Sequence, residues 1–178
     1  MTPLERKVQE LTCLYEVARS LSASLDIKAT AGDVLGILGT VLGMTRGTLT
    51  LYDPATDDLV ITAAYGLTPE EMARGRFKTG EGVTGAVFVS GEPMIVPDLG
   101  KESLFLNRTQ SRPDLSQLAL VAVPVQAQGQ TLGVLSVDRV FLDLARQRDR
   151  TRERPVRPFD AMIRLALLLA LLLTLTAD

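Results

Sequence analysis

The sequence predicts an α+β fold built on a mainly antiparallel sheet of five or six strands. Two segments, 47–65 and 118–139, each contain two apolar runs separated by a short turn, which is typical of antiparallel hairpins. Amphipathic patterns typical of helices open the chain and precede the first hairpin. Because the strands do not alternate with long helices, a doubly wound parallel sheet is not expected.

The first 25 residues are expected to form a helix with an apolar seam. Apolar and small residues alternate at steps of four and three, as in a heptad repeat, and they predict a helix from about Pro3 to Ser24. A second set of apolar residues widens the stripe, so one face could pack on the domain and another on a partner. We therefore assign 1–25 as a dimerisation and signalling helix, with an ordinary amphipathic helix as the alternative. The seam comprises Leu4, Val8, Leu11, Tyr15, Ala18, Ser22 and Leu25.

A second helix and the first hairpin should follow. Asp26 is a suitable N-cap for a helix from Ile27 to Leu42, and Gly43 is a suitable C-terminal stop. Strands are expected at 47–53 and 59–65, joined by a turn at 54–58.

The middle of the chain predicts short elements only. Thr68 and Glu71 are spaced as a capping box at the start of a short helix, with proline at its first position. Another short helix is expected from Val83 to Ser90, closed by Gly91, and a short strand at 94–96.

The second hairpin should close the sheet. Its strands are expected at 118–126 and 131–139, around a turn at 127–130, and Pro124 favours an edge or bulge position. We assign 26–140 as the core domain.

The end of the chain differs in composition from the core. Arg146 to Arg157 carries six arginines and two acidic residues, which favours a solvated linker, assigned to 141–158, over a nucleic-acid contact because no aromatic residue interleaves the arginines. The Leu-rich run at 161–177 is short for a membrane span and contains Arg164. We expect a C-terminal helix at 159–178 that packs against the N-terminal helix, and dimerisation through these terminal helices.

Composition excludes several functional classes. The chain of 178 residues has a net charge of −2, no histidine and one cysteine, Cys13. The commonest general base and metal ligand is therefore missing, and a disulfide within the chain is impossible. We expect no enzyme, no metal site, no cofactor and no direct contact with nucleic acid or membrane. No secretory signal is visible at 1–10, so a cytoplasmic location is expected.

Three glycines match the spacing of a dinucleotide-binding loop. Gly80, Gly82 and Gly85 fit G-x-G-x-x-G, but the preceding residues are not a buried strand and the helix that follows is short. We interpret these glycines as a tight turn that packs a short helix on the sheet.

Longer segments resemble a known family. GEGVTGAVFVSGEPMIVPD at 80–98, the closing hairpin at 118–139 and the leading helices at 10–27 resemble GAF domains. The resemblance implies a GAF fold with terminal helices on one face of the sheet and short helices and loops over the other. RGTLTLYDP at 46–54, GRFKTGEGVTG at 75–85 and SLFLNRT at 103–109 are similar to the N-terminal GAF domain of nitrogen-fixation transcriptional activators.

That resemblance implies a regulatory sensor. In such activators an ATPase that acts on the σ54 form of RNA polymerase and a helix-turn-helix domain follow, and neither is expected within these residues because no G-x-x-x-x-G-K-[ST] loop is present. We expect a fragment or a stand-alone sensor that neither hydrolyses ATP nor reads DNA.

The resemblance also implies where a ligand would bind. GAF pockets lie between the sheet and a lid, here expected at 74–89 and 98–115. Cationic and neutral donors in this lid suit a small anion such as 2-oxoglutarate, because arginine offers a bidentate fork to a carboxylate. A nucleotide sensor and a ligand-free dimerisation or protein-interaction module are the alternatives. The candidate ligand-binding residues are Arg108, Asn107, Thr109, Arg76, Lys78 and Arg112.

Overall fold

The structure, a computed structural model, describes residues 27–140 together with 2, 4–5, 7–9, 11–12, 15–16 and 19. Most of the described positions from Leu4 to Arg19 are helical, as the heptad seam predicts. Cys13, the Asp26 cap, the Arg-rich linker at 141–158 and the C-terminal helix at 159–178 lie outside the described residues.

Within this part of the chain, six strands form one antiparallel sheet in the order β3-β2-β1-β6-β5-β4. The strands are β1 (Arg46–Asp53), β2 (Asp58–Tyr65), β3 (Arg76–Lys78), β4 (Met94–Val96), β5 (Leu118–Ala127) and β6 (Gln130–Val140). The helices are α2 (Ile27–Leu42), α3 (Pro69–Arg74), α4 (Gly82–Ser90) and the 3-10 turn η1 (Leu99–Lys101). The predicted α+β class is confirmed.

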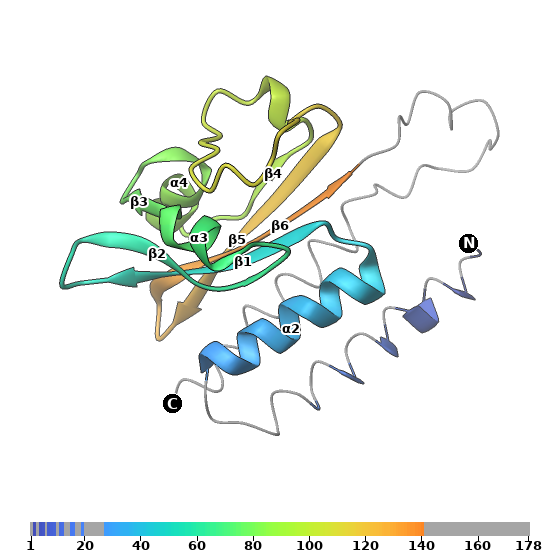
Figure 1. Cartoon of the computed structure of the whole chain (residues 1–178). Coiled ribbons are helices and arrows are strands. Elements are labelled where there is room, and N and C mark those ends of the chain that lie inside the picture. The colour runs from blue at the N-terminus through green and yellow to red at the C-terminus, as the bar shows by residue number, and fades with distance from the viewer. Residues whose placement is uncertain are drawn as a thin grey trace.

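The sheet separates two apolar layers. Helix α2 covers one face, where Val34, Leu35 and Leu38 pack against strand residues such as Leu49 and Val121. Helices α3 and α4 and the loop after η1 lie over the opposite face (Figure 1). There a second cluster joins α4 to β5 and β6.

Several local predictions are confirmed. Helix α2 has the predicted bounds, and Thr68 forms a complete capping box with Glu71. Gly91 ends α4 in the left-handed conformation, with φ of 65°. Pro124 lies beyond the last residue of β5 that pairs with β4, Ala122, so its missing N–H leaves no donor unpaired on that side.

Strand β3 was expected to be part of the lid. It forms because Phe77 is buried between exposed Arg76 and Lys78, and this alternation pairs the three residues with the edge of β2. The glycine motif has the predicted structural role, since a Cβ on Gly85 would lie 2.6 Å from the carbonyl oxygen of Lys78. Only glycine permits this close approach of α4 to the preceding turn.

Candidate functional site

The two central strands place polar side chains on the face below the lid. Thr48 and Ser136 are cross-strand partners, and their hydroxyl oxygens lie 2.7 Å apart. Arg46 and Asp138 are the next pair on the same face, two residues before Thr48 in β1 and two residues after Ser136 in β6. The intervening residues face α2 and are apolar or glycine, so the alternation is regular.

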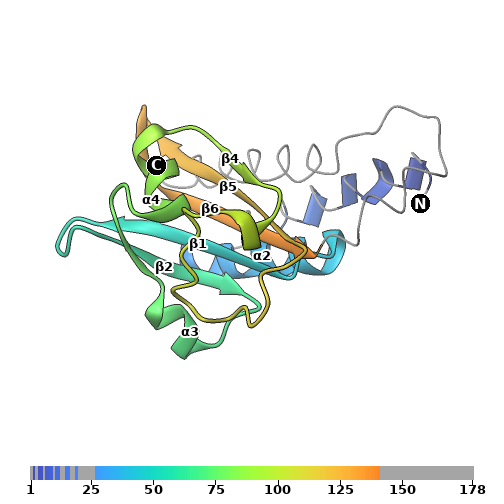
Figure 2. The ribbon, with the colours of Figure 1, turned by 90° about the horizontal axis from the view of Figure 1, so that it is seen from above.

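A small cavity lies between these residues and the lid. Its volume is about 30 Å³, the space of roughly one water molecule, whereas ligand pockets typically measure about 300–1,000 Å³. Figure 2 shows the segment after β4 passing over the central strands. Half of the lining is polar and half apolar: Thr48, Thr50, Thr84, Thr109, Arg112 and Ser136, and Ile61, Phe77, Val83, Phe105, Leu106 and Leu120.

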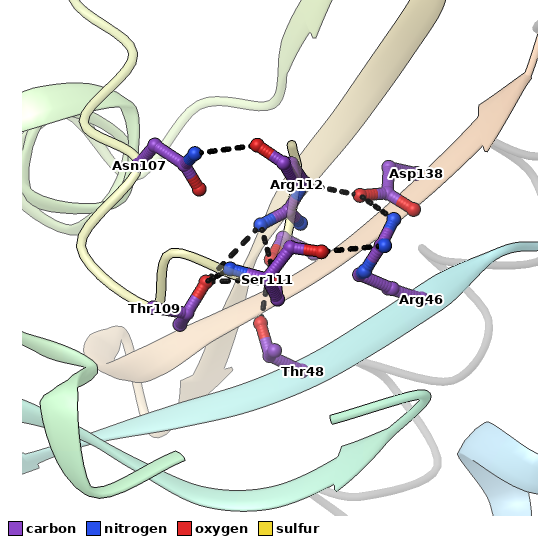
Figure 3. Close-up of polar contacts among 8 residues, drawn as sticks. Arg46, Thr48, Asn107, Thr109, Ser111, Arg112 and Asp138 are labelled. Carbon is purple, nitrogen blue, oxygen red and sulfur yellow. Dashed lines mark hydrogen bonds and ion pairs between the residues drawn. The ribbon is translucent and has the colours of Figure 1, made fainter. Parts of the chain in front are cut away.

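A buried ion pair connects the lid to the sheet. The Nε of Arg112 lies 2.5 Å from the Oδ2 of Asp138, and their side chains are 8% and 0% exposed. The Nη1 of Arg112 donates to the hydroxyls of Thr109 at 3.4 Å and Ser111 at 3.3 Å, and its guanidinium lies over the ring of Phe105. Arg112 thus ties the loop before β5 to strand β6, and Figure 3 shows its contacts with Asp138, Thr109 and Ser111.

A second arginine shares the same carboxylate. The Nη1 of Arg46 lies 4.0 Å from the Oδ2 of Asp138, and its Nη2 donates to the carbonyl oxygen of Ser111 at 2.6 Å. Burial raises the pKa of Asp138 and lowers the pKa of Arg112, while the charge of each opposes the shift of the other. Two guanidinium groups share this one buried carboxylate, and the charge of Glu71 also acts on Arg112.

Three of the six predicted residues come together at this site. Thr109 and Arg112 line the cavity, and the Nδ2 of Asn107 donates to the carbonyl oxygen of Arg112 at 2.9 Å. In the described part of the chain, the buried Asn107 Oδ1, Asp138 Oδ1 and Arg46 Nε have no hydrogen-bond partner. The hydrogen bond from Asn107 to the Arg112 carbonyl holds the lid backbone in the arrangement that the ion pair needs.

The other three predicted residues make ion pairs outside the cavity lining. Lys78 and Arg76 contact Asp58 on β2 at 2.7 and 3.5 Å. The hydrogen bond from Lys78 lowers the pKa of Asp58. Arg108 pairs with Glu81, at the start of α4. Their role in ligand binding stays a prediction.

Sequence reasoning missed the residues that the sheet and α3 contribute. Arg74 donates from Nε and Nη2 to the carbonyl oxygen of Thr109, at 3.0 and 2.6 Å. Asp138 and Ser136 alternate with apolar residues in LSVDR, as Thr48 and Thr50 do in GTLTL. This period of two places polar groups on one face of a strand buried on both sides, and it could have identified the floor of the site.

The described residues offer two further constraints. They contain no group of three or more His, Cys, Asp or Glu side chains that could hold a metal ion. No helix among them is both long and apolar enough to cross a membrane.

Fold and site together define an α+β domain that encloses a cavity between an antiparallel sheet and a cover of short helices and loops. The chain belongs to the GAF domain family, which matches residues 26–172. A crystal structure of the A. aeolicus nlh2 GAF domain in an inactive state superposes with a TM-score of 0.77 at 24% identity, covering 96% of each chain. That likeness supports the fold.

The predicted similarity to nitrogen-fixation regulators is also confirmed. The chain is 42% identical over 134 residues to a Nif-specific regulatory protein of Azospirillum lipoferum, covering 74% of this chain and 21% of that protein. It is 39% identical over 132 residues to the Nif-specific regulatory protein of Herbaspirillum seropedicae, covering 73% of this chain and 24% of that protein. The chain thus spans about a fifth to a quarter of the length of these relatives.

Proposed function

We propose that the chain is the regulatory GAF domain of a nitrogen-fixation transcription activator and that it binds a small anionic metabolite. Its relatives are named Nif-specific regulatory proteins, which supports regulation in place of catalysis. The output would be the σ54-dependent ATPase and DNA-binding domains that the family resemblance implies.

The buried charge cluster is the observation that carries the ligand class. Arg46 and Arg112 share one carboxylate, Asp138, and Arg112 also lines the cavity. An anion in the cavity would pair with the guanidinium of Arg112, which is 8% exposed and so has little access to bulk water. The hydroxyls of Thr48, Ser136 and Thr109 would donate to the remaining oxygens of a carboxylate or phosphate.

Ligand entry requires movement of the lid. A cavity of about 30 Å³ has no room for a molecule with the ten non-hydrogen atoms of 2-oxoglutarate. Two polar contacts join the lid to the sheet: Arg112 with Asp138, and Arg46 with the carbonyl oxygen of Ser111. Arg74 with the Thr109 carbonyl and Arg108 with Glu81 join the two lid segments to each other. Opening between Thr109 and the sheet would enlarge the cavity towards Arg112.

The same small volume supports a second candidate function, a protein-interaction module that binds no metabolite. In that case the charge cluster would serve only to hold the lid closed. Titration calorimetry separates the two, because a module without a ligand gives no heat with any candidate.

The test is calorimetry with 2-oxoglutarate, inorganic phosphate and nucleotides. Thr48→Val and Ser136→Ala each remove a hydroxyl, and we expect each to weaken binding about 10-fold or more. Lys101→Gln is the control for Arg112→Gln, since both remove one positive charge and Lys101 lies outside the cavity, paired with Asp98. Equal losses of affinity in Arg112→Gln and Lys101→Gln would contradict the site. Loss of binding in Arg76→Gln or Arg108→Gln would place the ligand outside the cavity.

We also propose that the domain is a homodimer through its terminal helices. The described seam residues Leu4, Val8, Leu11 and Tyr15 are 73%, 55%, 58% and 66% exposed. Gln9, on the same helix, donates its side-chain amide to the carbonyl of Val41 on α2, so the helix contacts the domain through another position.

Light scattering tests the dimer. We expect Val8→Asp, or a chain that begins after Ser24, to be monomeric. Val89→Asp is the matched control, since Val89 is 67% exposed on a different surface. A dimer that survives Val8→Asp would rule out this seam.

A further inference from the structure

The lid is organised around Arg112. The carbonyl oxygen of this residue accepts from Asn107, its guanidinium donates to Thr109 and Ser111, and it lies 5.3 Å from the ring centre of Phe105. A change in the position of this guanidinium therefore alters its contacts with Phe105, Thr109 and Ser111 in the lid.

Asp138 belongs to a different part of the molecule. It lies two residues before the end of β6 at Val140, and its carbonyl oxygen accepts from the backbone N–H of Thr45 at 2.9 Å. Arg46, its cross-strand partner, is the first residue of β1. Asp138 therefore lies near the end of β6, where the chain leaves the sheet.

The carboxylate of Asp138 lies near two guanidinium groups but makes a close contact with only one of them. Arg112 contacts its Oδ2 at 2.5 Å, whereas the Nη1 of Arg46 is 4.0 Å from the same atom. Asp138 Oδ1 and Arg46 Nε are buried, belong to facing residues and have no partner in the described part of the chain (Figure 3). A small shift could join these two atoms, giving two discrete arrangements of the cluster.

We propose that Asp138 changes its guanidinium partner when an anion engages Arg112, from Arg112 in the closed state to Arg46 in the bound state. The exchange couples the lid to the exit end of β6 and so regulates the attached domains. The mechanism rests on the proposed ligand site, but the coupling between lid and strand is a property of the free protein.

Arg112→Gln in the full 178-residue chain mimics the bound state, because it removes the guanidinium from Asp138. We expect the Nε–H resonance of Arg46, measured by 15N NMR, to shift downfield as it begins to donate to Asp138. A folded variant whose Arg46 resonance is unchanged would overturn the proposal, whether or not any metabolite binds the wild-type protein.

Hydrogen exchange of Thr109→Val provides a second measurement. The substitution preserves shape and removes a lid hydroxyl that contacts Arg112 and Ser111 but neither Arg46 nor Asp138. We expect faster exchange at 136–140 as well as in the lid. Glu81→Gln is the control, since it weakens the Arg108 contact within the lid and should leave 136–140 unchanged. Faster exchange at 136–140 in the control, or in neither variant, would show that the ion pair transmits nothing.

Discussion

Replacing Arg112 by methionine tests the energetic role of the buried ion pair. The substitution leaves the carboxylate of Asp138, which is fully buried, with Arg46 at 4.0 Å as its remaining cationic partner. Removing one partner of a buried pair typically costs about 3–5 kcal/mol when the other charge is left uncompensated, and Arg46 should offset part of this cost. At about 2–4 °C per kcal/mol for a chain of this size, we expect Tm to fall by roughly 6–20 °C.

The double variant completes the cycle. Asp138→Leu alone should destabilise by a similar amount, because it leaves Arg112 without its carboxylate. Combined with Arg112→Met it removes both charges, and such replacements are often neutral or stabilising by about 1–4 kcal/mol. We therefore expect the double variant to recover most of the lost stability in urea unfolding monitored by circular dichroism.

Two outcomes would refute this reasoning. A loss of less than about 1 kcal/mol in Arg112→Met would mean that the pair is effectively solvated or that Arg46 replaces Arg112 fully, and either result would refute the estimate. A double variant as unstable as the sum of the single variants would mean that the two charges do not interact. Arg108→Met is the control, because its partially exposed pair with Glu81 should contribute about 0–1 kcal/mol.

The remaining predictions concern single sites. Lys78→Gln should raise the pKa of Asp58 towards its ordinary value, as measured by carboxyl NMR titration. The stabilisation from this ion pair is present above the unfolded pKa of Asp58 and is lost as the pH falls through its lowered folded pKa. An unchanged pKa of Asp58 in the variant would exclude the contact. Gly85→Ala places a Cβ 2.6 Å from the carbonyl oxygen of Lys78 and should cost about 1–3 kcal/mol in urea unfolding, so a neutral effect would contradict the close approach. Thr68→Ala removes the hydroxyl of the capping box and should cost about 1 kcal/mol, with faster hydrogen exchange confined to α3; a global change would show a different role.

Local signals in the sequence predict most of the fold. The bounds of α2, the cap at Thr68 and the stop at Gly91 depend on neighbouring residues only, and the structure has them as predicted. Strand β3 was missed because three residues are too few for a periodic signal, and their pairing depends on the edge of β2.

The site was less accessible to the same reasoning. Asn107, Thr109 and Arg112 were found through the resemblance of SLFLNRT and its neighbours, and they do cluster. Arg46 and Asp138 come from strands at opposite ends of the domain sequence, and they meet because β1 and β6 are neighbours in the sheet. Charge alone could not rank the candidate residues. A lysine or arginine in the lid segments can pair with a carboxylate outside the cavity, as Lys78 does with Asp58.

The pairing of the first strand of the sheet with the last has a consequence for biosynthesis. Strands β1 and β2 can form a hairpin as soon as they leave the ribosome, but the floor of the cavity needs Ser136 beside Thr48 and Asp138 beside Arg46. Pairing β1 with β6 closes the long chain segment between them, which carries a high entropic cost, so this pairing should form late in folding. A nascent chain that ends before β6 therefore has a lid segment without Ser136 and Asp138, and the cavity is complete only after the last described strand has been made.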